Sequence, residues 1–301
     1  MSVAAASTGL ALARRRHRRR RVLIEAGSVM LAVILLIWSL IPVYNMFLIA
    51  LDPEEGEVEF TGNIWPPEPS LDAFGVVLTQ ADRYLEHFWQ QFGNSLFIGL
   101  MTMLLTVLIG SLAGFAASRM RLGKGSLITN TALVTYVLPA AFLTIPFYLV
   151  VHSYGLSNDP WGVIAAQVTF ATPFAILILR HYASLIPLEL DDAARIDGAS
   201  AVQVFFRIYL PLITPALAVV AIYALVLAWN DYFYQFVLLT TPSQMTVAMM
   251  QGHMFEDPDA AWNAMMAAAI IYSLPPIVIF FALRRYMAAG LTMGGLKGMT
   301  P

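Results

Sequence analysis

The sequence predicts an all-α, polytopic membrane protein with six transmembrane helices and a short helical loop on the cytoplasmic side. Hydrophobic residues make up 59% of the 301-residue chain and charged residues only 12%, whereas soluble domains carry about 25% charged residues. The apolar residues also gather into runs long enough to cross a bilayer, which takes about 20 residues per helix. Cysteine is absent, which excludes disulfides and thiolate metal sites.

Six apolar runs are the expected spans, each bounded by charged residues, glycine or proline. They are residues 22–51, 93–118, 125–152, 161–182, 212–240 and 262–286. The transmembrane domain is therefore expected at 22–286, with an N-terminal tail at 1–21 and a C-terminal tail at 287–301. In the second span, Gly110 and Gly114 form a small-residue pair, which favours close packing between membrane helices.

Basic residues lie almost entirely on one side of these spans. They are Arg14–Arg16, Arg18–Arg21, Arg119, Arg121, Lys124, Arg180, Arg195, Arg207, Arg284, Arg285 and Lys297, with Arg83 on the other side. Acidic residues dominate that other side, above all in the loop at 52–92. Because Lys and Arg collect in cytoplasmic loops, both termini and the loop at 183–211 are expected in the cytoplasm.

The two segments outside the spans have distinct compositions. The arginine-rich residues 1–21 are expected to be a disordered, positively charged anchor, with nucleic-acid binding as a remote alternative that we set aside. The acidic loop at 52–92 is expected to be extended and to end in a short amphipathic helix near Tyr84, Phe88 and Trp89, whose aromatic rings suit a membrane interface.

The loop at 183–211 carries the signals of two consecutive helices. Pro187 suits the first turn of the first helix, with Ser184 as a possible cap, and the acidic residues that follow favour a helix N-terminus. Asp191 and Arg195 are four residues apart and can pair. Gly198 can end this helix in the left-handed conformation. Ser200 and Gln203 then form a capping box, and Pro211 and Pro215 break the second helix.

One spacing in this loop is specific. Asp192-Ala193-Ala194 is followed after three residues by Gly198, and after nine more by Ile208-x-Leu210-Pro211. It resembles the cytoplasmic signature of the membrane subunits of ATP-binding-cassette importers, in which Glu usually stands at the position of Asp192. The resemblance implies that the first helix docks in a cleft on an ATPase subunit and couples it to the spans. The alternative is an ordinary helical loop with a solvated charged face.

The residues expected to serve this coupling share the loop and its two helices. They are Glu189, Asp192, Ala193, Ala194, Arg195, Asp197, Gly198 and Pro211.

Further motifs resemble the carbohydrate-importing branch, specifically the second, shorter permease subunit of the maltose and glycerol-3-phosphate type. They are Ile186-Pro187 with Glu189-Leu190, Ile196–Ser200, Ala228–Asp231, Gly290–Thr292 and Gly295–Gly298. The likeness covers about residues 22–298. It implies a bacterial inner membrane protein whose partners are a homologous second permease, two ATPase subunits that bind ATP and Mg, an extracytoplasmic solute-binding protein, and a sugar or polyol substrate.

The resemblance also gives the C-terminal tail a role. In that branch the tail can insert between the two ATPase subunits, which implies contacts by Gly294, Gly295 and Lys297. The alternative is a frayed terminus without a partner.

A polar solute that crosses a membrane needs polar and aromatic groups inside the spans. The candidates in this chain are Asn94, Tyr136, Gln167, Trp229, Asn230, Asp231 and Tyr234. Interface belts and hydrogen bonds between helices explain the same residues. The resemblance further implies that the larger partner subunit can supply most of the sugar contacts.

The sequence carries no enzyme chemistry. It has no glycine-rich phosphate loop ending in Lys-Ser or Lys-Thr, and its five histidines show no metal-ligand spacing. We therefore expect no cofactor or metal in this chain, and a source of energy outside it. Two other functions stay open at this point: a secondary transporter driven by an ion gradient, and a membrane scaffold without transport activity.

Overall fold

The computed structural model describes residues 3–53, 64–119, 131, 134 and 139–295, and this part of the chain contains helices and no strand. The helices, in order, are α1 (Val3–Ala50), α2 (Asp72–Thr79), α3 (Phe88–Arg119), η1 (Ala140–Leu143), α5 (Thr144–Ser153), α6 (Pro160–Ser184), α7 (Glu189–Ile196), α8 (Ala201–Val204), η2 (Phe205–Tyr209), α9 (Leu210–Leu212), α10 (Thr214–Asn230), α11 (Phe233–Leu238), α12 (Val247–Glu256) and α13 (Trp262–Gly295). The predicted all-α class is confirmed.

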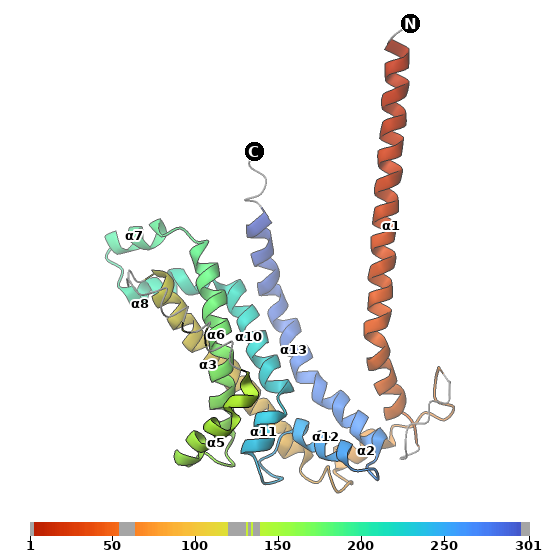
Figure 1. Ribbon diagram of the computed structural model, residues 1–301, viewed down its shortest axis with the longest axis vertical. Helices are drawn as coiled ribbons and strands as arrows, with labels where there is room; N and C mark the ends of the chain where they lie inside the picture. The colour runs from red at the N-terminus through yellow and green to blue at the C-terminus, as the bar shows by residue number, and fades with distance from the viewer. Residues whose placement is uncertain (1–2, 54–63, 120–130, 132–133, 135–138, 296–301) are drawn as a thin grey trace.

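Three long helices form the centre of the bundle. The helix α3 packs along α6 and α10, and α10 also packs against α13 (Figure 1). The predicted small-residue contact is present: a Cβ added to Gly110 would lie 2.7 Å from the Cβ of Ala175 on α6, and one added to Gly114 would lie 3.1 Å from the Cβ of Leu179. Membrane helices approach this closely only where side chains are small.

Four helical segments are long and apolar enough to cross a membrane on their own: Arg20–Ala50, Phe88–Arg119, Pro160–Ser184 and Trp262–Met287. They match the predicted first, second, fourth and sixth spans. Residues 201–212 and 214–230 make a fifth candidate, bent by 78° at the break between them. The first half of the predicted third span, 125–138, lies outside the described residues apart from 131 and 134, so the count of six stays a prediction.

The predicted fifth span, 212–240, is wrong at its C-terminal end. The helix α10 stops at Asn230, Asp231 takes an extended conformation with ψ 122°, and the chain restarts as the short α11. The break falls at the polar pair Asn230 and Asp231, which we assigned from the sequence to a transport pathway and not to a helix end.

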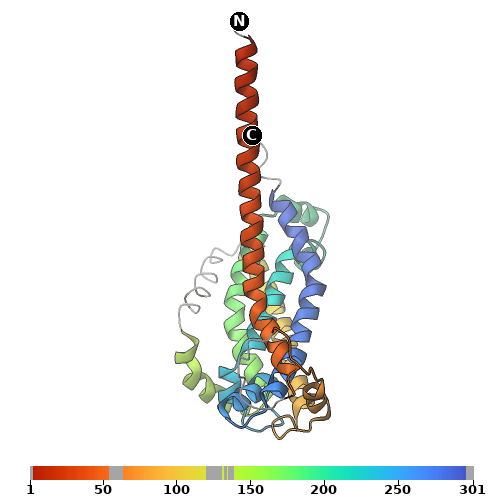
Figure 2. The ribbon, with the colours of Figure 1, turned by 90° about the vertical axis from the view of Figure 1, so that its right-hand side faces the viewer.

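The N-terminal segment also differs from the prediction. Residues 3–21 continue the first span as helix, so α1 is a single helix of 48 residues and is about 72 Å long at 1.5 Å per residue. Alanine-rich sequence favours this continuation. Figure 2 shows α1 projecting beyond the bundle, and from Arg20 to Tyr44 its side chains are exposed.

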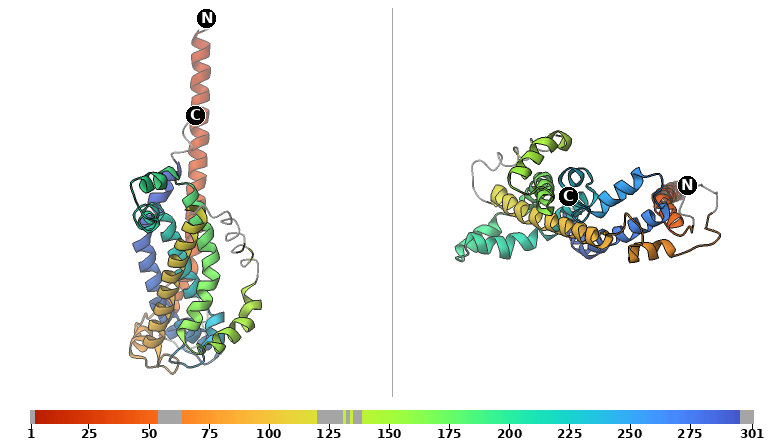
Figure 3. Two further views of the ribbon diagram at one scale, coloured as in Figure 1. Left: turned by 90° about the vertical axis from the view of Figure 1, so that its left-hand side faces the viewer. Right: turned by 90° about the horizontal axis from the view of Figure 1, so that it is seen from below.

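The two ends of the bundle carry different elements. In Figure 1, α7 and α8 lie toward the same end as the C-terminal end of α13 and the N-terminal half of α1, whereas α2, α11 and α12 lie at the other end. Figure 3 shows that α7 and α8 sit at the edge of the bundle opposite α1. The orientation of the termini and of the 183–211 loop relative to a membrane stays a prediction.

The expectation about the 52–92 loop needs correction. The short helix of this loop is α2, which ends at Thr79 and is followed by Gln80, whose φ of 58° is left-handed. Phe88 and Trp89 instead begin α3. At the other terminus α13 continues to Gly295, so Gly294 and Gly295 are helical, while the span candidate within α13 ends at Met287. Lys297 lies outside the described residues.

The α3–α6 contact makes a testable prediction. Gly110→Ala is expected to lower the free energy of unfolding by about 1–3 kcal/mol, because the new methyl group overpacks the contact with Ala175. Gly93→Ala is the matched control: it lies on the same helix with nothing within 4 Å of the added Cβ. The midpoint of thermal unfolding in detergent measures both, and equal midpoints would contradict the tight contact.

Candidate functional site

The helix α7 is the first candidate element, and it begins later than the sequence suggested. Its first residue is Glu189, and Leu188 at its N-cap provides no side-chain hydrogen bond. Ser184 is the last residue of α6, and its hydroxyl donates to the carbonyl of His181 at 2.7 Å, so the predicted cap is wrong. The acidic first turn and Arg195 in the last turn both complement the helix dipole.

The surface of α7 is almost entirely exposed. Among the eight residues of α7, Asp191 alone is buried. Ile196 is 86% exposed and Leu190 46% exposed, although both are large and apolar. Ala194 is half-buried against the helices below, whereas Asp192 and Ala193 face outward. The exposed side of α7 therefore includes two large apolar side chains besides its charged residues.

The turn after α7 follows the prediction. Gly198 has a φ of +86°, a conformation that favours glycine. The Ser200 hydroxyl accepts from the Gln203 amide at 3.3 Å, and the Gln203 side chain accepts from the Ser200 amide at 2.8 Å. This capping box begins α8, so the helix-turn-helix form of the loop is confirmed.

The second helix of the loop widens before it turns into the bundle. It continues from α8 through the π-helical turn η2, in which the Leu210 amide donates to the carbonyl of Phe205. Pro211 lacks an amide hydrogen and its ring excludes the regular α-helical turn before it. The chain then bends at Ile213, which lies midway between Pro211 and Pro215.

Asp191 does not pair with Arg195 as predicted. Its carboxylate lies 3.5 Å from Nε of Arg119 at the end of α3, and the two side chains are only 4% and 2% exposed. The same guanidinium donates through Nη2 to the carbonyl of Ala183 at 3.1 Å. An exposed pair four residues apart on a helix contributes a few tenths of a kcal/mol, whereas removing one partner of a buried pair costs about 3–5 kcal/mol.

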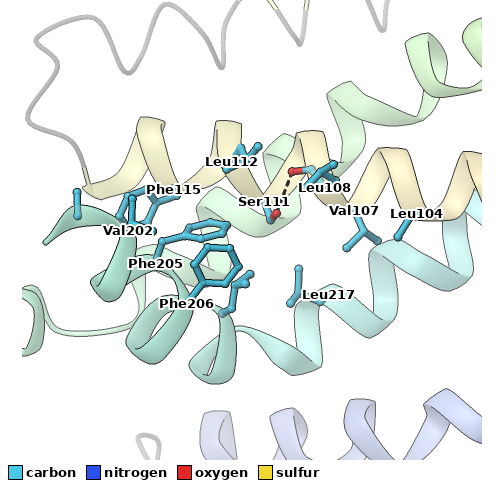
Figure 4. A pocket seen from close by; sticks show the side chains of 12 residues that line it. Leu104, Val107, Leu108, Ser111, Leu112, Phe115, Val202, Phe205, Phe206 and Leu217 are labelled. Atoms are coloured by element: carbon cyan, nitrogen blue, oxygen red, sulfur yellow. Dashed lines mark hydrogen bonds between the residues drawn. The ribbon is translucent and has the colours of Figure 1, made fainter.

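An apolar groove lies beside this loop. It has a volume of about 550 Å³ between α3 on one side and α8, η2 and α10 on the other. Figure 4 shows Phe205, Phe206 and Leu217 across from Leu104, Leu108 and Leu112. The one hydroxyl in its lining, that of Ser111, donates to the carbonyl of Leu108 at 2.9 Å. The groove therefore does not suit a polar solute.

The second candidate site is the set of residues expected along a transport pathway, and the structure brings only some of them together. The Gln167 side chain lies beside the Asp231 carboxylate. Asp231 accepts from the amides of Tyr234 and Gln235 at 3.4 and 3.3 Å, which caps α11. The Tyr234 ring packs on Phe147 and Phe170.

The remaining candidates lie in other surroundings. Trp229 is buried and stacks on Tyr272 of α13 at 4.7 Å. Asn230 is exposed and donates to the carbonyl of Val226 on its own helix. Asn94 donates to the carbonyls of Ser243 and Met245, at 2.8 and 2.9 Å, and so holds the loop before α12. Tyr136 lies outside the described residues.

Sequence reasoning missed two groups that organise these sites. Arg119 was expected in a loop, as one basic residue among others, but it is buried. Gln235 is buried too: its amide donates to the carbonyl of Ala228 at 3.1 Å, and its carbonyl accepts from the hydroxyl of Thr246. No spacing in the sequence indicates either contact, because each partner lies on another element.

At the opposite end of the bundle a polar cluster ties two loops together. The carboxylate of Asp257 accepts from the guanidinium of Arg83 and the hydroxyl of Tyr84. The Tyr84 hydrogen bond, the Asp259 amide and the Arg83 charge hold the pKa of Asp257 below its usual value, and the same hydrogen bond raises the pKa of Tyr84. The cluster fixes the segment before α3 against the start of α13.

The cap at Asp231 makes a testable prediction. Asp231→Ala is expected to lower the free energy of unfolding by about 1 kcal/mol, because α11 loses its capping acceptor. Asp231→Asn keeps a carbonyl oxygen in the same place, so its free energy of unfolding is expected to stay near that of the parent protein. Thermal unfolding in detergent compares the two variants, and an equal loss in both would argue against a capping role.

Comparisons with known proteins agree with these features. Residues 106–293 match the family described as binding-protein-dependent transport system inner membrane component. An inner membrane ABC transporter permease protein of Escherichia coli is 28% identical over 93% of this chain and 99% of its own length. A trehalose/maltose transport system permease protein of Thermococcus litoralis is 30% identical over 93% of this chain and 98% of its own.

Another relative is a maltodextrin transport system permease protein of Bacillus subtilis, 35% identical over 69% of this chain and 75% of its own. Among solved structures, a chain of a bacterial ABC transporter involved in the import of the acidic polysaccharide alginate superimposes with a TM-score of 0.68. That likeness covers 87% of this chain and 96% of the other at 22% identity, and it shows a common fold. Since the family match spans more than half of its length, the chain belongs to the binding-protein-dependent transport system inner membrane components.

Proposed function

We propose that this chain is one half of the permease of an ATP-driven, binding-protein-dependent importer of a sugar or polyol, and that α7 docks on a partner ATPase subunit. The exposed surface of α7 carries this proposal. It combines the Asp192-Ala193-Ala194 spacing with outward-facing Ile196 and Leu190, on a helix held at one end of the bundle.

The chemistry of α7 indicates the kind of cleft that would receive it. Glu189 and Asp192 offer exposed carboxylates, which suit basic groups on the partner. Ala193 is small and outward-facing, and allows the partner backbone to come close. Ile196 supplies an apolar side chain of the kind that anchors an interface when it enters a pocket. Arg195, Asp197 and Gly198 extend the exposed polar rim.

Such a permease needs partners for every step it does not perform. A homologous second permease completes the pathway, and two ATPase subunits bind ATP and Mg and hydrolyse the nucleotide. A solute-binding protein delivers the solute at the end of the bundle that carries α2 and α12. The C-terminal residues Gly294, Gly295 and Lys297 are proposed to contact the ATPase subunits.

Relatives of this chain support the choice of a carbohydrate. Their names include transport of trehalose and maltose, maltodextrin and arabinooligosaccharides. Gln167, Trp229 and Asp231 stay the candidates for contacts along the pathway in this chain. Because the apolar groove beside α3 offers no free polar group, we place the pathway on the other helix faces, shared with the second permease.

The proposed orientation places α7 in the cytoplasm and α2 outside. Because the chain has no cysteine, single cysteines can report it. Ile196→Cys is expected to react with a membrane-impermeant maleimide only in inverted vesicles, and Ala81→Cys only in right-side-out vesicles. Labelling of Ile196→Cys from outside would contradict the docking of α7 on a cytoplasmic ATPase.

The docking surface makes a second prediction. Ala193→Arg is expected to weaken binding of the ATPase subunits by at least about tenfold, equivalent to about 1.4 kcal/mol, because a long charged side chain keeps the two backbones apart. Co-purification of ATPase with the tagged permease, together with ATP-driven uptake in proteoliposomes, measures the effect. Ser184→Arg places the same charge at the exposed end of α6 and is the control. Normal ATPase binding by Ala193→Arg would refute the proposed surface.

A further inference from the structure

We infer that Arg119 and Asp191 are positioning residues: their buried ion pair makes α7 move as one body with α3 and α6. This inference rests on the proposed docking of α7. It assigns to the pair the step by which displacement of α7 reaches the helices of the bundle.

Few contacts hold α7 to the rest of the chain. Its two flanking segments are turns, at 185–188 and at 197–200. Of the residues within the helix, Asp191 alone is buried, and Ala194 adds a half-buried apolar contact. The carboxylate of Asp191 is therefore the buried polar attachment of α7, and it lies 3.5 Å from Nε of Arg119.

Arg119 joins three elements at one point. It is the last residue of α3, and while its Nε faces Asp191 on α7, its Nη2 donates to the carbonyl of Ala183 near the end of α6. The planar guanidinium presents several donors in a fixed geometry, so it can serve a carboxylate and a carbonyl at once. A displacement of α7 consequently pulls on α3 and α6 together.

The Arg119–Asp191 contact is an ionic approach without a hydrogen bond, and its surroundings strengthen the attraction. Both side chains are almost fully removed from solvent, and charges attract more strongly in such surroundings than in water. The second helix of the loop packs on α3 as well. The ring centroids of Phe115, Phe205 and Tyr209 are 5.0–5.6 Å apart. A Cβ added to Gly114 would lie 3.0 Å from the Tyr209 hydroxyl, so this helix lies close to the backbone of α3 at Gly114.

The test uses the complete importer in lipid nanodiscs, with partner subunits free of cysteine. A fluorescent label on Gly93→Cys, at the exposed far end of α3 from Arg119, reports whether trapping of the ATPase subunits with ATP and vanadate reaches that helix. A cysteine at Leu188, an exposed residue just before α7, reports docking in a separate preparation by cross-linking to the ATPase subunit. ATP hydrolysis is measured in parallel.

Arg119→Ala and Asp191→Asn are expected to keep the cross-link and ATP hydrolysis but to reduce the label response about tenfold, within the range by which residues of a coupling network alter coupling. The double variant is expected to show the same reduced label response as either single variant, because the pair acts as a unit. Asp191→Glu should restore much of the response. Arg207→Ala removes an exposed arginine from the same loop and should leave the label response, the cross-link and ATP hydrolysis unchanged.

Three outcomes would overturn the inference alone: a full label response in Arg119→Ala, additive losses in the double variant, or a lower yield of complex with a normal response per complex. If the single variants fail to assemble, Arg119→Met with Asp191→Leu supplies the test, since apolar replacement of both partners generally preserves the fold. A full response in that variant also overturns the inference. Absence of the Leu188 cross-link in the parent complex would refute the docking proposal itself.

Discussion

The close approach of α3 to α6 is the contact on which the rest of the structure depends. In a bilayer no hydrophobic driving force brings two apolar helices together, so their association relies on packing between small residues. Gly110 and Gly114 supply this packing against Ala175 and Leu179. Because the two helices run side by side to their ends, Arg119 at the end of α3 can reach the carbonyl of Ala183 on α6. The position of α7 therefore follows from helix packing about two turns away.

The sequence predicts the long helices well and their interruptions poorly. Hydropathy located four spans because a lipid-facing helix must stay apolar over its whole length. It failed at Asp231, where the residues beyond the break are still apolar while one carboxylate ends α10 and caps α11. It also failed at residues 3–21, where charge suggested disorder although the alanines favour helix. A single capping contact and a helical propensity are both invisible to a count of apolar residues.

The loop shows the same division between local and distant signals. Gly198 and the Ser200 capping box were predicted because each acts within a few residues of the chain. The partner of Asp191 was not predicted, because Arg119 is 72 positions away in the sequence and nothing in either neighbourhood singles it out. The local alternative, Arg195, would have given a weak exposed pair. The buried contact prevails because the fold brings Arg119 to the only buried position on α7.

The hydrogen bonds that polar groups already make in this structure bear on the source of energy for transport. A carrier driven by an ion gradient needs a carboxylate whose bonding can change within the membrane. Asp231, the one candidate found for that role, has its oxygens committed to the amides of Tyr234 and Gln235, so releasing it would uncap α11. At the other end of the bundle α7 offers an exposed surface and a buried ionic attachment to two long helices. That combination suits a chain that is moved by another protein, in keeping with its membership of a family of membrane components that serve binding-protein-dependent transport.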